Sequence, residues 1–151
     1  MSPATPARIG WRLSPLCGTV RRMASQTSNF CIDAADPYAQ TMWWKDVLED
    51  FRLTDEDQHP GDEECGLEGP DGRFLLFLKV PEAKSVKNRM HMCLRPTDRT
   101  RDEEIDRLLG LGATVVNDLR KPDRGWAVLA DPEGNEFCIL MRQSDLPAEL
   151  Q

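Results

Sequence analysis

The order of the expected secondary-structure elements repeats along this chain. An extended segment over 29–33, an amphipathic helix and three further extended segments are followed, from residue 89 onward, by the same order. A strand–helix–three-strand unit of about 55 residues buries one face of its sheet under its helix and leaves the other face open. We therefore predict an α+β fold in which two βαβββ modules form a curved mixed sheet around a cleft.

Both predicted helices carry start signals. Asp36 followed by Pro37 is typical of an N-cap and the first helical position. Thr100 with Glu103 three residues later indicates a capping box. The expected apolar stripes are Trp44, Val47, Leu48 and Phe51 in the first helix, and Ile105, Leu108 and Leu109 in the second.

The composition changes near residue 28. The segment before it contains arginine and proline but no acid, which favours a disordered N-terminal extension over an organelle presequence. Met23 as the natural start, with read-through upstream, is a further alternative. We expect a disordered extension over 1–28, a folded domain over 29–141 with modules of about 29–80 and 88–141, and a C-terminal tail over 142–151.

Charge and cysteine content exclude several classes of partner. Residues 33–151 carry 15 basic against 26 acidic side chains, so nucleic acid and anionic membranes are unfavourable partners. Apolar runs such as Phe74–Leu78 are far shorter than the roughly 20 residues that span a bilayer. The five cysteines are scattered without a C-x-x-C pair. These features predict a soluble protein in the reducing cytoplasm.

Alternation in the strands assigns side chains to the two faces of each sheet. We use "open face" for the face turned away from the helix. In the strand predicted over 89–95, the apolar set Met90, Met92 and Leu94 is expected under the helix, which places Arg89, His91, Cys93 and Arg95 on the open face.

The outer strands follow the same rule. In the last strand, Phe137, Ile139 and Met141 are expected in the core, so that Glu136, Cys138 and Leu140 face the other way. In the first strand, Phe30 and Ile32 are expected in the core, with Asn29, Cys31 and Asp33 on the open face.

His91 and Glu136 are the candidate metal ligands, with Glu136 also the candidate catalytic group. An imidazole and a carboxylate converging on one open face suit a divalent ion such as Zn, Fe, Mn or Ni. Cys93 is either a soft donor beside His91 or a small apolar filler. A hydrogen-bonded structural histidine and a glutamate at a hairpin rim are the alternatives. No phosphate loop or dinucleotide fingerprint is present, so no organic cofactor is expected.

Two segments carry a resemblance to a known family. Residues 87–95 (KNRMHMCLR) and 125–140 (GWAVLADPEGNEFCIL) resemble the glyoxalase-like branch of the vicinal oxygen chelate superfamily, and the likeness extends over 29–141. The resemblance implies paired βαβββ modules, with metal ligands on the first and last strands of each module. His91 and Glu136 stand at those positions in the second module. The first module offers Cys31 or Asp33, and Leu76 to Leu78, where ligands would be expected.

Two functions are consistent with this pattern. The first is a metal-assisted lyase, isomerase or dioxygenase-type enzyme acting on a small oxygenated metabolite, with Arg89 and Arg95 holding a carboxylate or phosphate and Trp126 stacking on the substrate or packing in the fold. The alternative is a non-catalytic drug- or metabolite-binding protein of the bleomycin-resistance type. A homodimer is expected, since two modules leave sheet edges unpaired.

Overall fold

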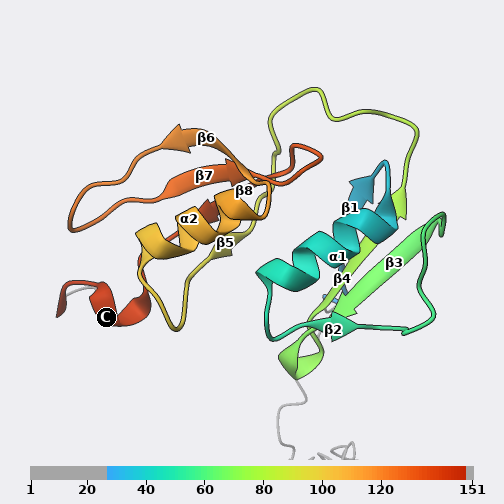
Figure 1. Ribbon diagram of the computed structural model, residues 1–151, viewed down its shortest axis with the longest axis horizontal. Coiled ribbons are helices and arrows are strands. Elements are labelled where there is room, and N and C mark those ends of the chain that lie inside the picture. Colours follow the sequence, from blue (N-terminus) through green and yellow to red (C-terminus); the bar gives the residue numbers. More distant parts are fainter. Residues whose placement is uncertain (1–26, 149–151) are drawn as a thin grey trace, which may run out of the picture.

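The computed structural model describes residues 27–148, which form two mixed sheets of four strands with one helix on each (Figure 1). The predicted α+β fold of two βαβββ modules is therefore confirmed. The prediction for 1–28 falls largely outside the described residues, and the prediction for 142–151 falls partly outside them. No helix in the described part of the chain is long and apolar enough to cross a membrane.

In each sheet the first strand of the module lies at one edge and runs parallel to the last strand of the module, which lies beside it. The other two strands are antiparallel to their neighbours. The first sheet has the order β1-β4-β3-β2 and the second the order β5-β8-β7-β6. The first module contains β1 (Phe30–Ala34), α1 (Pro37–Val47), β2 (Arg52–Leu53), β3 (Glu64–Glu68), the 3-10 turn η1 (Pro70–Gly72) and β4 (Phe74–Lys79). The second contains β5 (Cys93–Leu94), α2 (Arg101–Gly110), β6 (Thr114–Asp118), β7 (Ala127–Ala130), β8 (Glu136–Ile139) and the turn η2 (Gln143–Asp145).

The helix starts agree with the sequence signals. The Asp36 side chain accepts a hydrogen bond from the Ala39 amide at 3.0 Å, and α1 begins at Pro37. Thr100 and Glu103 form the reciprocal capping box that starts α2. These caps satisfy backbone N–H groups that have no partner within the first turn of a helix.

Two predictions for the strands were wrong. The strand expected over 89–95 is reduced to Cys93–Leu94, and Met90 is 77% exposed. The segment before Cys93 crosses from one module to the other, and its backbone contact with β8 is the hydrogen bond that the Cys138 amide donates to the Met92 carbonyl at 2.9 Å. Phe30 was expected in the core but is 55% exposed, because it begins the edge strand β1. Met92 and Leu94 do pack against the core.

The two modules share an aromatic contact. Trp44 of α1 is 1% exposed and its ring lies 5.1 Å, edge to face, from the ring of Phe137 in β8. Trp43 contacts both rings in the same manner. The indole N–H of Trp44 donates to the buried carboxylate of Asp131 at 3.1 Å. One core therefore spans both modules.

Helix α1 is also held at both ends by the second module. The Glu133 carboxylate accepts hydrogen bonds from the amides of Ala35 and Asp36, at 2.7 and 2.9 Å. At the other end, Arg107 of α2 donates to the carbonyls of Asp46 and Val47. An anion at the N-terminus and a cation at the C-terminus both favour the helix dipole. The turn 131–135 therefore has a structural role in joining the modules.

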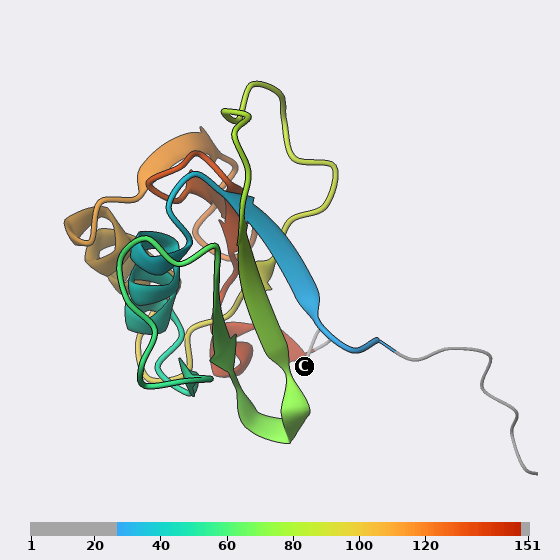
Figure 2. The ribbon, with the colours of Figure 1, turned by 90° about the vertical axis from the view of Figure 1, so that its right-hand side faces the viewer.

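The helices lie on one side of the molecule, as the view in Figure 2 shows. Residues 80–92, which we call the connector, link the two modules without regular secondary structure. In Figure 2 the connector arches outward on the side away from the helices.

Candidate functional site

A cavity of about 850 Å³ lies between β1, the connector and the segment that leads into β8. We call it the connector cavity. Its apolar wall comes from the first module and the connector, with Phe30, Ile32, Trp44, Leu75, Val86 and Met90 among the lining side chains. Its polar lining includes Arg89, His91 and Glu136. Three of the predicted site residues therefore line one cavity.

Glu136 is engaged by two lysines of the connector. Lys87 donates to one carboxylate oxygen, and the Lys84 ammonium lies 4.0 Å from the other. The side chain of Glu136 is 10% exposed. The hydrogen bond from Lys87 is the main reason why the pKa of Glu136 lies below its usual value. The carboxylate is therefore an anion already neutralised by its neighbours.

Arg89 and His91 have exposed side chains beside this ion pair. Neither forms a hydrogen bond or ion pair with another residue in the described range 27–148. A cation and an imidazole without internal partners are available to a molecule that enters the connector cavity.

His91 belongs to a group of three metal-binding side chains with Cys93 and Cys138. Their donor atoms all lie within 4.8 Å of one another, and no second group of three such donors occurs between residues 27 and 148. Cys93 of β5 and Cys138 of β8 are directly paired in the parallel register. We call this group the thiol–imidazole cluster. Glu136 is not a member of it.

The two thiols of the cluster differ in environment. Cys93 is exposed, whereas Cys138 is 3% exposed. Burial, followed by the neighbouring Cys93, raises the pKa of Cys138 to about 11. Alternation in the sequence places Cys138 on the open face together with Cys93. Cys93 was predicted from the sequence as a candidate soft donor, and Cys138 was missed. The signal that identifies Cys138 is its pairing with Cys93, which joins strands 45 residues apart.

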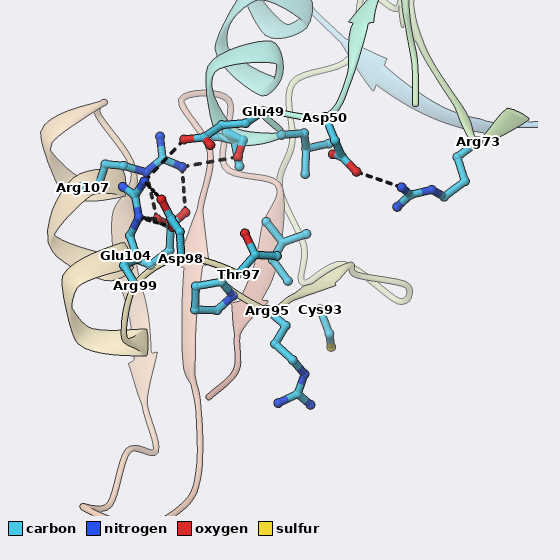
Figure 3. A pocket seen from close by; sticks show the side chains of 14 residues that line it. Glu49, Asp50, Arg73, Cys93, Arg95, Thr97, Asp98, Arg99, Glu104 and Arg107 are labelled. Carbon is cyan, nitrogen blue, oxygen red and sulfur yellow. Dashed lines mark hydrogen bonds and ion pairs between the residues drawn. The ribbon is translucent and has the colours of Figure 1, made fainter. Parts of the chain in front are cut away.

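Arg95 lies in a second cavity of about 510 Å³ (Figure 3). Its guanidinium donates to the Met141 carbonyl. The other charged lining residues are mutually paired: Arg107 binds Glu104 at 2.7 Å, and Arg73 binds Asp50 at 2.9 Å. Arg99 forms further ion pairs, with Asp98 at 2.8 Å and with Glu49 at 3.5 Å. The structure thus separates Arg95 from Arg89, and the other charged side chains that line the second cavity have ion-pair partners.

Trp126 lies outside the linings of both cavities. It is 41% exposed, and its carbonyl accepts a hydrogen bond from the Leu119 amide at 3.0 Å. The loop beside it is tied to α2 by Arg101, which donates to the carbonyls of Arg124 and Gly125. A substrate role for Trp126 stays a prediction.

A family model described as a glyoxalase-like domain matches residues 29–140. No curated protein matches the sequence.

Three solved structures share the fold. A mutant of the fosfomycin resistance protein FosX from Listeria monocytogenes, complexed with Mn(II) and 1S,2S-dihydroxypropylphosphonic acid, has a TM-score of 0.61 at 12% identity, covering 85% of this chain and 95% of that one. A glyoxalase/bleomycin resistance protein/dioxygenase family enzyme from Burkholderia phytofirmans has a TM-score of 0.57 at 21% identity, covering 74% and 94%. A possible glyoxalase from Bacillus cereus has a TM-score of 0.56 at 16% identity, covering 78% and 99%.

Proposed function

Since this chain belongs to the glyoxalase-like domain family, within the vicinal oxygen chelate superfamily, we propose that it binds a small oxygenated metabolite with an anionic group in the connector cavity. The observation that carries the proposal is the cavity itself, in which an apolar wall faces the unpartnered side chains of Arg89 and His91. A volume of about 850 Å³ lies within the usual range for small-molecule sites.

The lining favours a ligand with two different ends. Aromatic and aliphatic side chains such as Phe30 and Leu75 suit an apolar body. The guanidinium of Arg89 suits a carboxylate, phosphate or phosphonate, which it can bind through two parallel hydrogen bonds. Binding of this kind leaves the contacts of Glu136 with Lys84 and Lys87 intact. It requires no catalytic step from Glu136.

A thermal-shift screen with matched ligand pairs tests the proposal. Each pair contains a small aromatic or aliphatic acid and its neutral amide, added to the full chain. A ligand that prefers the native state stabilises it by about 2.7 kcal/mol at 100 times its Kd, and the melting temperature rises as a result. We expect the acid of at least one pair to raise the melting temperature by several degrees more than its amide.

The variant Arg89→Gln separates anion recognition from apolar burial. We expect it to remove the difference between acid and amide. Arg124→Gln is the matched control, because Arg124 is exposed, lines neither cavity and has an ion pair only with Asp123. Equal shifts for acids and amides in the unmodified chain would contradict the anionic part of the proposal. The absence of any shift across the screen would contradict binding in the cavity.

A metal-assisted lyase, isomerase or dioxygenase-type enzyme is the second candidate. His91 and Glu136 both line the connector cavity, and an ion held there would act as a Lewis acid on the oxygens of a substrate. The donor set opposes an oxygen-preferring ion, however, because Glu136 is paired with Lys84 and Lys87 while the donors beside His91 are thiols. We therefore derive no catalytic step through such an ion.

Metal analysis of protein prepared without a metal-binding tag tests this second candidate. Stoichiometric Mn, Fe or Ni that is lost in both His91→Ala and Glu136→Gln would favour the enzyme. Retention of the ion in Glu136→Gln would exclude the His91–Glu136 pair as its site.

We also propose that the chain forms a homodimer. Strand β6 lies at the edge of its sheet with all five residues exposed, and Val115 and Val116 are 51% and 49% exposed. Unpaired edges with apolar side chains favour association. Light scattering at micromolar concentration should give twice the 17.1 kDa mass of one chain. The mass of a single chain would contradict the dimer.

A further inference from the structure

We propose that the thiol–imidazole cluster of His91, Cys93 and Cys138 is a binding site for a thiophilic cation of the Zn²⁺ class, instead of an oxygen-coordinated Mn²⁺, Fe²⁺ or Ni²⁺ centre. This site is distinct from the proposed anion contact at Arg89, and it does not depend on a ligand in the connector cavity.

The geometry of the cluster follows from strand pairing. Cys93 and Cys138 are direct partners in the parallel pair of β5 and β8, so their side chains leave the sheet on the same face. His91 precedes Cys93 by two residues, and one of its ring nitrogens lies within 4.8 Å of both sulfur atoms. Three donors from a sequence span of 48 residues thus converge on one point of the second sheet.

The distances require only a small adjustment for coordination. A tetrahedral zinc ion with Zn–S bonds of about 2.3 Å holds two sulfur ligands about 3.8 Å apart. His91 and Cys93 are both exposed, so their side chains can rotate without disturbing the core. Cys138 is buried in β8 and supplies a fixed point.

The chemistry of the donors selects the class of ion. Thiolates prefer zinc and other thiophilic ions, whereas manganese and magnesium prefer carboxylate and carbonyl oxygen. Glu136, the nearest carboxylate in β8, is paired with Lys87 and Lys84. An ion with two thiolates and one imidazole gains no oxygen ligand from this carboxylate unless the ion pairs break.

Three protein donors leave one tetrahedral position unfilled. Zinc sites with this ligand number keep a water or substrate in the fourth position, in contrast to closed four-ligand structural sites. His91 lines the connector cavity and Cys93 lines the second cavity, so the cluster lies where the two linings meet. The open position is therefore accessible from solvent.

Titration with Co²⁺ and competition with Zn²⁺ test the proposal on the full chain. The protein is prepared without a metal-binding tag, reduced, freed of metal, and its thiols are counted before use. We expect one Co²⁺ per chain with a sulfur-to-cobalt charge-transfer band, displaced by one equivalent of Zn²⁺ but not by a large excess of Mn²⁺.

Variants of the cluster identify the ligands. Cys93→Ser changes an exposed side chain and should fold, and we expect it to weaken binding of Co²⁺ and Zn²⁺ by at least about tenfold. His91→Ala should do the same. Cys138→Ala supplies a second thiol variant without burying a hydroxyl group. Cys31→Ser is the matched control, because Cys31 is an exposed cysteine in the first strand of the other module. We expect it to leave the charge-transfer band unchanged.

The outcomes are decisive in both directions. Co²⁺ binding that survives Cys93→Ser, tight binding of Mn²⁺, or a loss of Zn²⁺ affinity in Glu136→Gln would overturn the proposal. So would a reduced chain that binds no Co²⁺ while its thiols remain free. A spontaneous Cys93–Cys138 disulfide under reducing preparation would also overturn it, since the two donors would then be consumed in a bond with each other.

Discussion

The two modules have the same topology but present different side chains at matching positions. In the first module the β1–β4 register pairs Cys31 with Leu76, whereas in the second the β5–β8 register pairs Cys93 with Cys138. Asn29 precedes Cys31 by two residues, and His91 precedes Cys93 by two residues. The first module therefore has one sulfur where the second has two sulfurs and an imidazole. Repetition of a backbone does not carry the chemistry of a site with it.

The first module contributes differently to the molecule. Its strand β1 supplies Phe30 and Ile32 to the apolar wall of the connector cavity, and its helix supplies Trp44 to the shared core. The second module supplies the polar groups and also the residues that hold α1 in place. This division between an apolar wall and a donor-bearing sheet predicts different responses to substitution.

The largest effect is expected where the modules meet. Trp44→Ala leaves a cavity against Phe137 and removes one of the hydrogen-bond donors of the buried Asp131. We expect a loss of about 3–5 kcal/mol in the free energy of unfolding, measured by urea denaturation. Trp126→Ala, at a 41% exposed tryptophan, is the control and should change this quantity by about 0.5 kcal/mol or less. Comparable losses in both variants would show that the shared core does not hold the modules together.

Transfer of the donor set to the first module would sharpen the comparison. The double variant Asn29→His with Leu76→Cys gives the first module the same three donors as the second. In the present chain the Asn29 amide already lies 3.0 Å from the Cys31 sulfur, so a side chain at this position reaches the thiol. We expect the stoichiometry of Co²⁺ binding to rise from one to two per chain. A stoichiometry of one would mean that the second sheet contributes more than its three donors.

The caps of the two helices offer a smaller difference. Helix α1 is capped by its own Asp36 and also by Glu133 of the other module, whereas α2 is capped only by its own Thr100 and Glu103. Glu133→Ala removes the acceptor for two backbone amides, and we expect a loss of about 1 kcal/mol in the free energy of unfolding. Glu103→Ala is expected to weaken only the start of α2. Amide hydrogen exchange distinguishes them: the first variant should deprotect α1 and the second α2. Deprotection of both helices in either variant would contradict this assignment.

Acidification is expected to lower the free energy of unfolding mainly through carboxylates of the second module. Hydrogen bonds from Arg120 lower the pKa of Asp118 from 3.8 to about 2. A carboxylate with a lowered folded-state pKa stabilises the fold above pH 3.8, and this contribution is lost as the pH falls toward 2. We expect the urea midpoint to fall over this interval, and less steeply in Asp118→Asn than in the control Asp123→Asn. Equal slopes would show that the Arg120–Asp118 contact contributes nothing to acid stability, as is common for exposed pairs.

The sequence predicted the local features of the fold and missed those set at long range. The helix caps at Asp36 and Thr100 and the repeated topology follow from short patterns, and the structure contains them. The length of β5 depends on how far the segment before Cys93 runs alongside β8, which alternation alone does not determine. Met90 was misassigned for the same reason.

The site was predicted in part. Arg89, His91 and Glu136 line one cavity as alternation suggested, but Arg95 lines the second cavity, where its guanidinium donates to the Met141 carbonyl. The partnership of Cys93 with Cys138 depends on the register between strands distant in sequence. Local patterns contain no information about that register.

The contact between Glu133 and the start of α1 also has a consequence for synthesis of the chain. The Ala35 amide and the carboxylate that binds it are 98 residues apart. At a translation rate of 5–20 residues per second, the start of α1 is synthesised roughly 5 to 20 s before Glu133. During that interval the indole of Trp44 has neither Phe137 nor Asp131 to contact. The nascent first module therefore presents the indole of Trp44 without its native partners until the last strand of the second module is made.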